Sequence, residues 1–300
     1  MSSPQHYDDA VSFRHALEDR LRKRALDHGE DLQRLRQQVA FDRFVTRIQY
    51  DGANRWILKG GHALELAIGS ARATRDIDLA LNTSIGRGSD NHVTLQRMLQ
   101  QAASRSPGDW LEFQVGESMM DLNGPLYGDE RFPLRSMLGG RLFVAFHVDV
   151  AVGDILLEPL RIATGEDWFG FAGIEASPLT TTSLEQQFAE KLHAYTMPRA
   201  GTRDNSRVKD LVDMVLLLET GSLEPEGVAA AVVATFRHRN SHLVPETLPG
   251  PPMSWKKPYA AMTAACHIDV DLAAAGDRVG GYYRRIATVI AATRPGTRTR

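Results

Sequence analysis

Apolar residues recur at helical spacing near the start of the chain. Two stripes stand out, one formed by Phe13, Leu17 and Leu21 and the other by Leu32, Leu35 and Val39. His28-Gly29 separates them, and glycine commonly follows the last turn of a helix. The spacing predicts two helices between residues 10 and 48.

The middle of the chain changes to the shorter periods of strands. Strands are expected at 54–58, 75–81, 110–115 and 141–152, with helices at 62–68 and 93–103 between them. Segments rich in Gly, Pro and acidic residues, at 82–90 and 123–130, are expected to be loops. After Ser177-Pro178 two possible capping boxes, Thr182 with Glu185 and Ser183 with Gln186, begin a largely helical region.

An Asp-x-Asp motif follows a glycine pair closely. Lys59-Gly60-Gly61 stands between a predicted strand and a helix, where backbone N–H groups can approach a phosphate. Arg72 and then Asp76-Ile77-Asp78 come next, and side chains at i and i+2 of a strand share a face. Two adjacent carboxylates repel unless a cation neutralises them, and Mg²⁺ takes one or two carboxylates with phosphate and water. The unit predicts a metal-dependent nucleotide site.

A third carboxylate interrupts an apolar strand at Asp149. If this strand lies beside the Asp76 strand, the acid completes a three-carboxylate site able to hold two metal ions about 3.5–4 Å apart. The alternative is an acid on an edge strand that faces water. Asp269-Val270-Asp271 repeats the Asp-x-Asp pattern without any such surroundings, so context has to decide.

Charged residues also occur on apolar helix faces in the C-terminal part. Lys191 lies on the side of its predicted helix that carries Leu184 and Phe188, where a lysine either borders a cleft or is a partly covered surface residue. Downstream, Asp210 and Asp213 share a helical face. Asp213 could equally form an ordinary surface ion pair with Lys209.

Composition and charge limit the class of protein. The 300 residues carry a net charge of −2, 43% hydrophobic residues and one cysteine, Cys266. One cysteine excludes an internal disulfide and a cysteine-based zinc cluster. No apolar run reaches the roughly 20 residues that span a bilayer, and the polar start lacks the order of a signal peptide, so a cytoplasmic protein without a membrane partner is expected. Residues 231–300 hold ten Lys/Arg against four acids, which fits either a nucleic-acid surface or a solvated helix face.

Four motifs in order resemble the nucleotidyltransferase-type toxins of the AbiEii/AbiGii kind, which include the mycobacterial MenT group. They are Leu58-Lys59-Gly60-Gly61-x-Ala63-Leu64-x-Leu66, Arg72-x-Thr74-x-Asp76-Ile77-Asp78, Lys191-Leu192-His193-Ala194 and Lys209-Asp210-Leu211-Val212-Asp213. The likeness extends weakly to Phe236-x-x-Arg239 and to Trp255. One position departs from the pattern, because His62 stands where relatives usually have Ser or Thr.

The resemblance implies an α+β fold, with a polymerase-β-like nucleotidyltransferase lobe containing a mixed sheet over 1–178 and a helical lobe over 179–300. It also implies Asp76, Asp78, Lys191 and Asp213 as catalytic residues, with Asp76 and Asp78 binding the catalytic metal. With Asp149 as a third ligand, the centre is expected to hold two Mg²⁺ ions. The expected nucleotide-binding residues are Gly60, Gly61, His62, Arg72, Arg207 and Asp210. His62 would bond phosphate or cap its helix.

The implied activity is that of a toxin from a toxin–antitoxin pair. Relatives add nucleotides from an NTP to the 3′ acceptor end of tRNA, which blocks aminoacylation and translation, and a cognate antitoxin is a possible partner. Transfer to a protein side chain would use the same metal and triphosphate machinery. A non-catalytic RNA-binding or partner-binding module of the same fold is a third interpretation, which the intact Asp pair disfavours.

Overall fold

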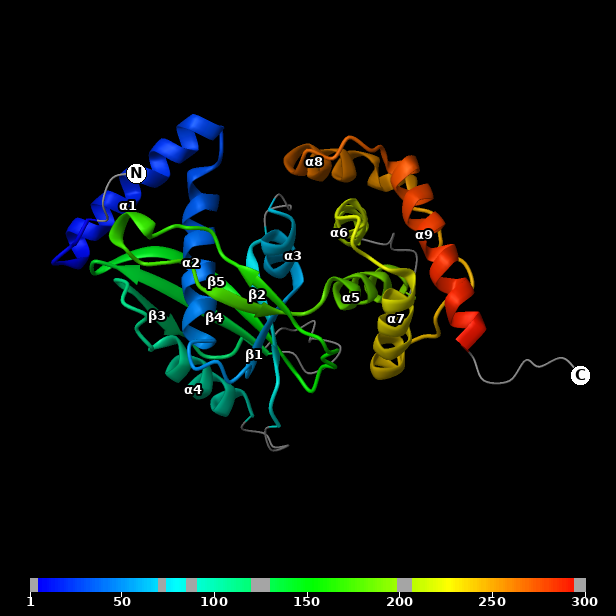
Figure 1. Cartoon of the computed structure of the whole chain (residues 1–300), viewed down its shortest axis with the longest axis horizontal. Coiled ribbons are helices and arrows are strands. Elements are labelled where there is room, and N and C mark those ends of the chain that lie inside the picture. The colour runs from blue at the N-terminus through cyan, green and yellow to red at the C-terminus, as the bar shows by residue number, and fades with distance from the viewer. Residues whose placement is uncertain (1–4, 70–73, 85–90, 120–129, 199–206, 294–300) are drawn as a thin grey trace, which may run out of the picture. The chain divides into compact units, whose positions relative to one another are not determined.

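The computed structural model describes residues 5–69, 74–84, 91–119, 130–198 and 207–293 (Figure 1). The chain divides into two compact units. Unit 1 comprises residues 1–66, 73–154 and 162–181, and unit 2 comprises residues 67–72, 155–161 and 182–300. Unit 1 contains almost all of the sheet, and helices α5 to α9 lie in unit 2, so the expected α+β class with a mixed sheet and a helical C-terminal part is confirmed.

The elements follow one another in this order: α1 Ala10–His28, α2 Leu32–Ile48, β1 Trp56–Lys59, α3 Gly60–Ile68, β2 Asp76–Leu81, α4 Asn91–Ala103, β3 Leu111–Val115, β4 Glu130–Leu138, β5 Arg141–Val152, β6 Arg161–Thr164 and β7 Pro178–Thr181. The C-terminal helices are α5 Leu184–Thr196, α6 Val208–Glu219, α7 Pro225–Arg239, α8 Lys256–Cys266 and α9 Leu272–Thr293, with short 3₁₀ turns at Gly170–Ala172 and Met253–Trp255.

The two N-terminal helices form where the apolar stripes predict them. Asp9 caps α1 by accepting hydrogen bonds from the amides of Val11 and Ser12. The helix stops at Gly29, which adopts a left-handed conformation with φ of 68°. Asp31 then caps α2. The stripe of α1 is buried, and α2 is buried along most of its second half.

Within the described residues, seven strands form one mixed sheet in the order β3-β4-β5-β2-β1-β7-β6. β2 pairs antiparallel with β1 and parallel with β5, which in turn pairs antiparallel with β4. β5 therefore lies inside the sheet and beside β2. The edge-strand alternative for Asp149 is wrong, and the expected neighbourhood of the two acidic strands is confirmed.

One face of the sheet belongs to the hydrophobic core. Ile77, Val148 and Phe132 stand in one row of this face across β2, β5 and β4, and all three are buried. The same core includes side chains of α1, α2 and α4, and Phe146 of β5 packs against Phe41 of α2 with ring centroids 4.8 Å apart. Because strand side chains alternate, Asp76, Asp78 and Asp149 face away from this core.

A buried ion network fastens α2 to the start of β3. Asp109 accepts hydrogen bonds from Arg43 Nε at 2.6 Å and from Arg47 Nη1 at 3.0 Å, and its side chain is fully buried. Arg47 also donates to the carbonyl of Leu111 at 2.6 Å. Each charge has a partner, as burial requires. The network holds the helix layer on the sheet.

Three strands were not predicted. β4 begins at Glu130, the last residue of a segment expected to be a loop, and Pro133 obscures its alternation because proline is rare inside sheets. β6 and β7 are only four residues each. The helical region begins after β7 rather than directly after Pro178, and of the two proposed caps Ser183 is the observed one, accepting from the amide of Gln186 at 3.2 Å.

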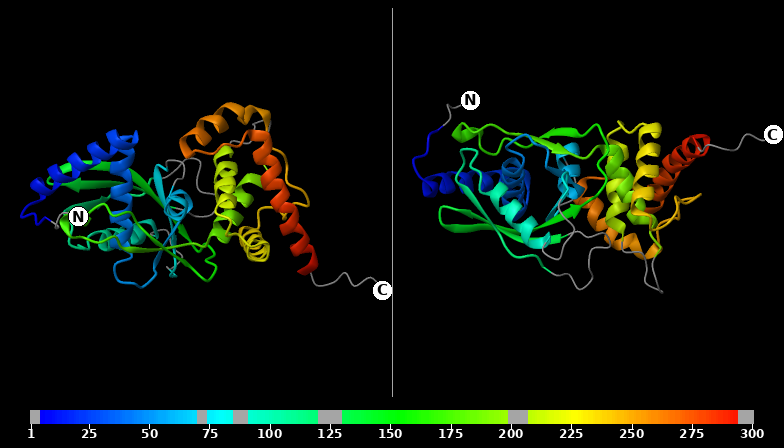
Figure 2. Two further views of the ribbon diagram at one scale, coloured as in Figure 1. Left: turned by 45° about the horizontal axis from the view of Figure 1, so that its top comes forward. Right: turned by 90° about the horizontal axis from the view of Figure 1, so that it is seen from below.

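Helices α5 to α9 belong to unit 2, where α5 packs against α6 and α7, and α9 also packs against α6 and α7 (Figure 2). α6 carries the most continuous buried surface, from Val208 to Leu217 apart from Lys209. Asp271 of the second Asp-x-Asp motif accepts from the amide of Ala274 at 2.8 Å and precedes α9, so this copy of the motif serves a helix end. None of the described helices combines the length and apolarity needed to cross a membrane.

Candidate active site

The acidic side chains gather on the sheet face opposite the core. Asp76 and Asp78 are both partly exposed while Ile77 between them is fully buried. This alternation follows directly from strand geometry. The prediction that the two carboxylates share a face is therefore confirmed.

The register of the sheet adds a charged neighbour on either side of the pair. Cα partners across β1, β2, β5 and β4 bring Lys59, Asp78, Asp149 and Arg131 into one row. We call this the cross-strand row. Adjacent strands lie about 4.8 Å apart, so neighbouring side chains of a row can interact directly. The row holds two carboxylates in the middle and a cation at each end.

Arg131 forms a bidentate ion pair with Asp149. Its Nε and Nη2 lie 2.7 and 2.6 Å from the two oxygens of that carboxylate, which is the bidentate geometry of a strong charge-assisted pair. Nη2 also lies 3.7 Å from Oδ2 of Asp76, whose Oδ1 is 3.3 Å from Nδ1 of His147. Arg131 therefore links two of the three acids.

Gly60 makes room for Asp78. A Cβ atom placed on Gly60 would lie 2.0 Å from Oδ2 of that aspartate, and the residue has φ of 68°, which disfavours L side chains. Gly60 also begins α3, where the first backbone N–H groups have no partner within the helix. The turn therefore brings phosphate-binding donors beside a carboxylate, and only glycine allows that approach.

Lys59 ends β1 at one end of the row. Its ammonium binds the carboxylate of Asp154, just beyond β5, and both side chains are largely buried. This pair joins the end of β1 to the chain that leaves β5. It fixes the point at which the glycine turn begins.

His62 does not lie at the surface of the turn. Its side chain is 2% exposed, with Nε2 3.1 Å from Asp42 of α2 and Nδ1 3.3 Å from Glu65 of α3. Burial alone would lower the pKa of His62, but the hydrogen bonds to Asp42 and Glu65 raise it to about 9. The same contact with His62 lowers the pKa of Glu65 against the effect of its burial. Neither ring nitrogen remains for a phosphate, so the structure gives His62 a role in holding α3 against α2.

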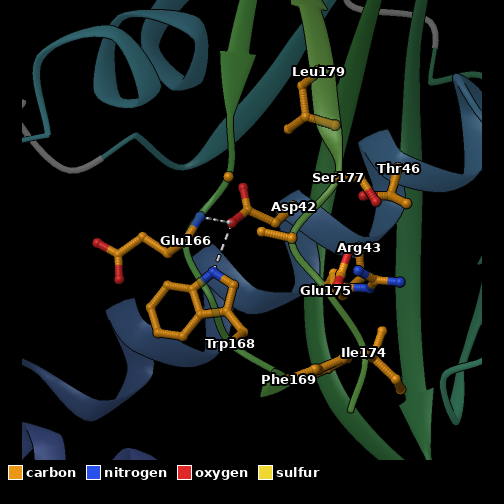
Figure 3. Close-up of a pocket in the computed structure, with 12 residues that line it drawn as sticks. Asp42, Arg43, Thr46, Glu166, Trp168, Phe169, Ile174, Glu175, Ser177 and Leu179 are labelled. Atoms are coloured by element: carbon orange, nitrogen blue, oxygen red, sulfur yellow. Dashed lines mark hydrogen bonds between the residues drawn. The ribbon is translucent and has the colours of Figure 1, made fainter. Parts of the chain in front are cut away.

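Asp42 is the centre of this contact. It accepts hydrogen bonds from Trp168 Nε1 at 2.6 Å and from the amide of Glu166 at 3.3 Å, as the dashed lines in Figure 3 show. The surrounding pocket combines α2 with residues 165–179. One buried carboxylate thus connects α2, α3 and the segment before β7, and it fixes the scaffold behind the glycine turn.

In unit 2, Lys191 and Asp213 form a buried pair. Nζ of Lys191 lies 2.8 Å from Oδ2 of Asp213 and 3.6 Å from Oδ1 of Asp210. Asp213 has no exposed side-chain surface, whereas 13% of the Lys191 side chain is exposed. The proposed surface pair of Asp213 with Lys209 is wrong, because Lys209 is exposed and Asp213 faces the other way. Asp213 is placed to hold the ammonium of Lys191.

Three further predicted residues are Arg207 and Asp210, which lie beside Lys191, and Arg72. Arg207 precedes α6, and its Nη1 is 3.7 Å from Oδ2 of Asp210. Asp210 is almost fully buried. Its carboxylate lies between the cations Lys191 and Arg207. Arg72 lies outside the residues that the structure describes.

The donor set on the acidic face suits a divalent magnesium-type ion. Asp76 and Asp78 offer hard carboxylate oxygens on one side of β2, and Asp76 is 32% exposed. Among the described residues, no group of three acidic, histidine or cysteine side chains converges on a common point in metal-binding geometry. The residues fit an ion that takes its other ligands from phosphate and water.

Sequence reasoning missed Arg131 and His147. His147 could have been found, because it stands two residues before Asp149 on the same strand and therefore on the same face. Arg131 had a weaker signal, the alternation of buried Phe132, Leu134, Ser136 and Leu138 around Pro133. Its pairing with Asp149 depends on the hairpin of β4 and β5.

We compared the chain with protein-family models, curated proteins and solved structures. A family model described as the nucleotidyl transferase AbiEii toxin of type IV toxin–antitoxin systems matches residues 43–281. No curated protein matches the chain. Among solved structures, MenT4, a nucleotidyltransferase toxin from Mycobacterium tuberculosis H37Rv, is similar in fold, with a TM-score of 0.52, 16% identity, and coverage of 92% of this chain and 99% of that one. JHP933 from Helicobacter pylori has a TM-score of 0.46 and 13% identity, over 87% of this chain and 94% of its own.

Proposed function

The chain belongs to the AbiEii family of nucleotidyltransferase toxins of type IV toxin–antitoxin systems, and we propose that it transfers a nucleoside monophosphate from an NTP to the 3′ acceptor end of tRNA. The product would be a tRNA that cannot be aminoacylated, which stops translation. The observation that carries the proposal is the Asp76/Asp78 pair beside the Gly60 turn, because it combines metal ligands with phosphate donors.

The reaction is an in-line displacement at the α-phosphate. The 3′-hydroxyl oxygen forms the new P–O bond, the bond from the α-phosphorus to the β-bridging oxygen breaks, pyrophosphate leaves and the hydroxyl proton passes to water. A bound Mg²⁺ would supply Lewis-acid stabilisation of the charge that develops on the transferred phosphate. Asp76 and Asp78 would hold the ion, and the first N–H groups of α3 at Gly60 and Gly61 would bind phosphate oxygens.

The residues of unit 2 complete the proposal. The family resemblance supports a triphosphate-binding role for Lys191, and Asp213, 2.8 Å from its Nζ, would keep the ammonium charged and oriented. Asp210 links Lys191 to Arg207 in the same cluster. We treat Asp213 as a positioning residue because its carboxylate is fully buried.

The test uses purified protein, Mg²⁺ and each of the four α-labelled nucleotides, with total RNA and total protein offered together. Label in the tRNA fraction, lost in an Asp76→Asn variant, is the expected result. Asp269→Asn is the matched control, because it makes the same change in the exposed second Asp-x-Asp motif. That control should retain full activity.

Other outcomes identify the alternatives. Label in protein and not in RNA would replace tRNA with a protein side chain as the acceptor. No label with any nucleotide in the presence of Mg²⁺ would favour a non-catalytic binding module. Wild-type transfer by Asp76→Asn would remove the carboxylate pair from the mechanism.

The proposed partners follow from the family and the substrate. Membership of a toxin–antitoxin family implies a cognate antitoxin as well as the NTP. We place the reaction in the cytoplasm, where tRNA and nucleotides are present. Co-expression with the neighbouring gene product, compared with expression alone, tests the antitoxin by its rescue of growth.

A further inference from the structure

We infer that Arg131 takes the place of a second metal ion in this centre, which therefore binds a single divalent cation on Asp76 and Asp78. The inference rests on the proposed function, since it concerns the ion of the same reaction. It differs from the two-ion expectation, in which Asp149 is a metal ligand.

The first support is the way Asp149 is already bound. Its two oxygens accept from Nε and Nη2 of Arg131 at 2.7 and 2.6 Å. A second ion bridged by Asp149 would have to displace a bidentate arginine, whose planar fork matches a carboxylate better than any other side chain. The guanidinium lies where the positive charge of a second ion would be needed.

The second support is the register. Asp149 stands between Asp78 and Arg131 in the cross-strand row, with main-chain pairing on both sides. Arg131 comes from the interior strand β4, so the sheet holds its Cα beside Asp149. Its guanidinium needs no loop movement to reach the carboxylate. Arg131 is thus built into the centre as a fixed charge.

The charges and the ligand geometry of this face also support a single divalent ion. Three carboxylates, Asp76, Asp78 and Asp149, lie on this face, and Arg131 supplies a positive charge directly to Asp149. Nη2 of Arg131 also lies 3.7 Å from Asp76, so the guanidinium sits against the ligand pair as well. Within the described part of the chain no three acidic, histidine or cysteine side chains converge as metal ligands. Two carboxylates with water and phosphate suffice for Mg²⁺.

Counting bound ions tests the inference without measuring activity. Mn²⁺ is titrated into the full-length protein, and the free aqua ion is followed by electron paramagnetic resonance up to millimolar concentrations. We expect one ion on the wild type, none on Asp76→Asn and one on Asp149→Asn. Arg131→Ala frees the carboxylate and should bind two ions, whereas Arg131→Lys should bind one again.

The matched control is Arg135→Ala. Arg135 lies four residues along β4 on the same face, is exposed and pairs with Ala145 instead of an acid. It should bind one ion. The double variant Arg131→Ala with Asp149→Asn should also return to one ion, which ties the second ion to the freed carboxylate. Circular dichroism shows whether each variant is folded.

The possible outcomes distinguish a failure of the Arg131 role from a failure of the proposed nucleotidyl transfer. Two ions on the wild type, or only one on folded Arg131→Ala, would overturn the role of Arg131 and leave nucleotidyl transfer untouched. Loss of the single ion in Asp149→Asn would also overturn it. No bound ion on the wild type at millimolar Mn²⁺ would reject the metal centre and the proposed chemistry together.

Discussion

The buried imidazolium of His62 should make the stability of the protein fall as the pH rises from neutral. The group lies between Asp42 and Glu65, and its pKa is raised from 6.5 to about 9. A group whose pKa is higher in the folded state stabilises the fold fully below the unfolded value. That contribution is lost as the pH rises through the folded value. The window is therefore from pH 6.5 to about 9.

The size of the effect follows from the pKa difference. Each pKa unit corresponds to about 1.4 kcal/mol, so a rise to about 9 makes the contribution of His62 about 3 kcal/mol. The side chain is almost completely buried, so solvent does not screen the interaction appreciably. The lowered pKa of Glu65 changes the stability at acidic pH, below this window.

The assay is chemical denaturation at a series of pH values, followed by tryptophan fluorescence. Three of the four tryptophans, Trp56, Trp110 and Trp168, belong to unit 1, which contains His62. The stability difference between wild type and His62→Gln should shrink by about 3 kcal/mol across the window. Histidine NMR should show one imidazole that titrates near pH 9.

The control is His15→Gln, the same chemical change at an exposed position of α1. It should leave the pH profile of stability unchanged. Parallel stability profiles for wild type and His62→Gln from pH 6.5 to about 9 would refute the reasoning, because they would mean that His62 is neutral in the folded state.

Two further changes probe the site itself. Gly60→Ala should lower nucleotide transfer about 100-fold, because its Cβ would clash with the Asp78 carboxylate, and a displacement of a catalytic group by about 1 Å can cost that much. Gly52→Ala is the control, because Gly52 has a similar positive φ but open space around it. This control should retain activity in the same labelling assay. Asp213→Asn should lower the free energy of unfolding by about 3 kcal/mol, because it removes the nearer of the two buried carboxylates that face the Lys191 ammonium. The double variant Lys191→Met with Asp213→Leu should regain most of that stability in denaturation experiments without regaining transfer. Recovery of both stability and transfer would show that Lys191 has no role in the reaction.

Local sequence determined a large part of the fold. The stripes and caps of α1 and α2, the strands around Asp76 and Asp149, and the helical C-terminal part follow from periods of 3.6 and 2 that need only neighbouring residues. The same-face arrangement of Asp76 and Asp78 is local in this sense. It could be predicted because two residues along a strand always share a side.

Tertiary pairing decided which charges surround that pair. Arg131 and His147 reach the acids through strand registers that join segments far apart in sequence, and a shift of one residue would turn each side chain to the other face. His62 shows the same limit, because a short polar turn predicts contact with phosphate or a helix cap, whereas packing against Asp42 buries the ring. The sequence thus determined the carboxylate pair and its glycine turn. Only the folded sheet decided that an arginine, held by β4, neutralises the third acid.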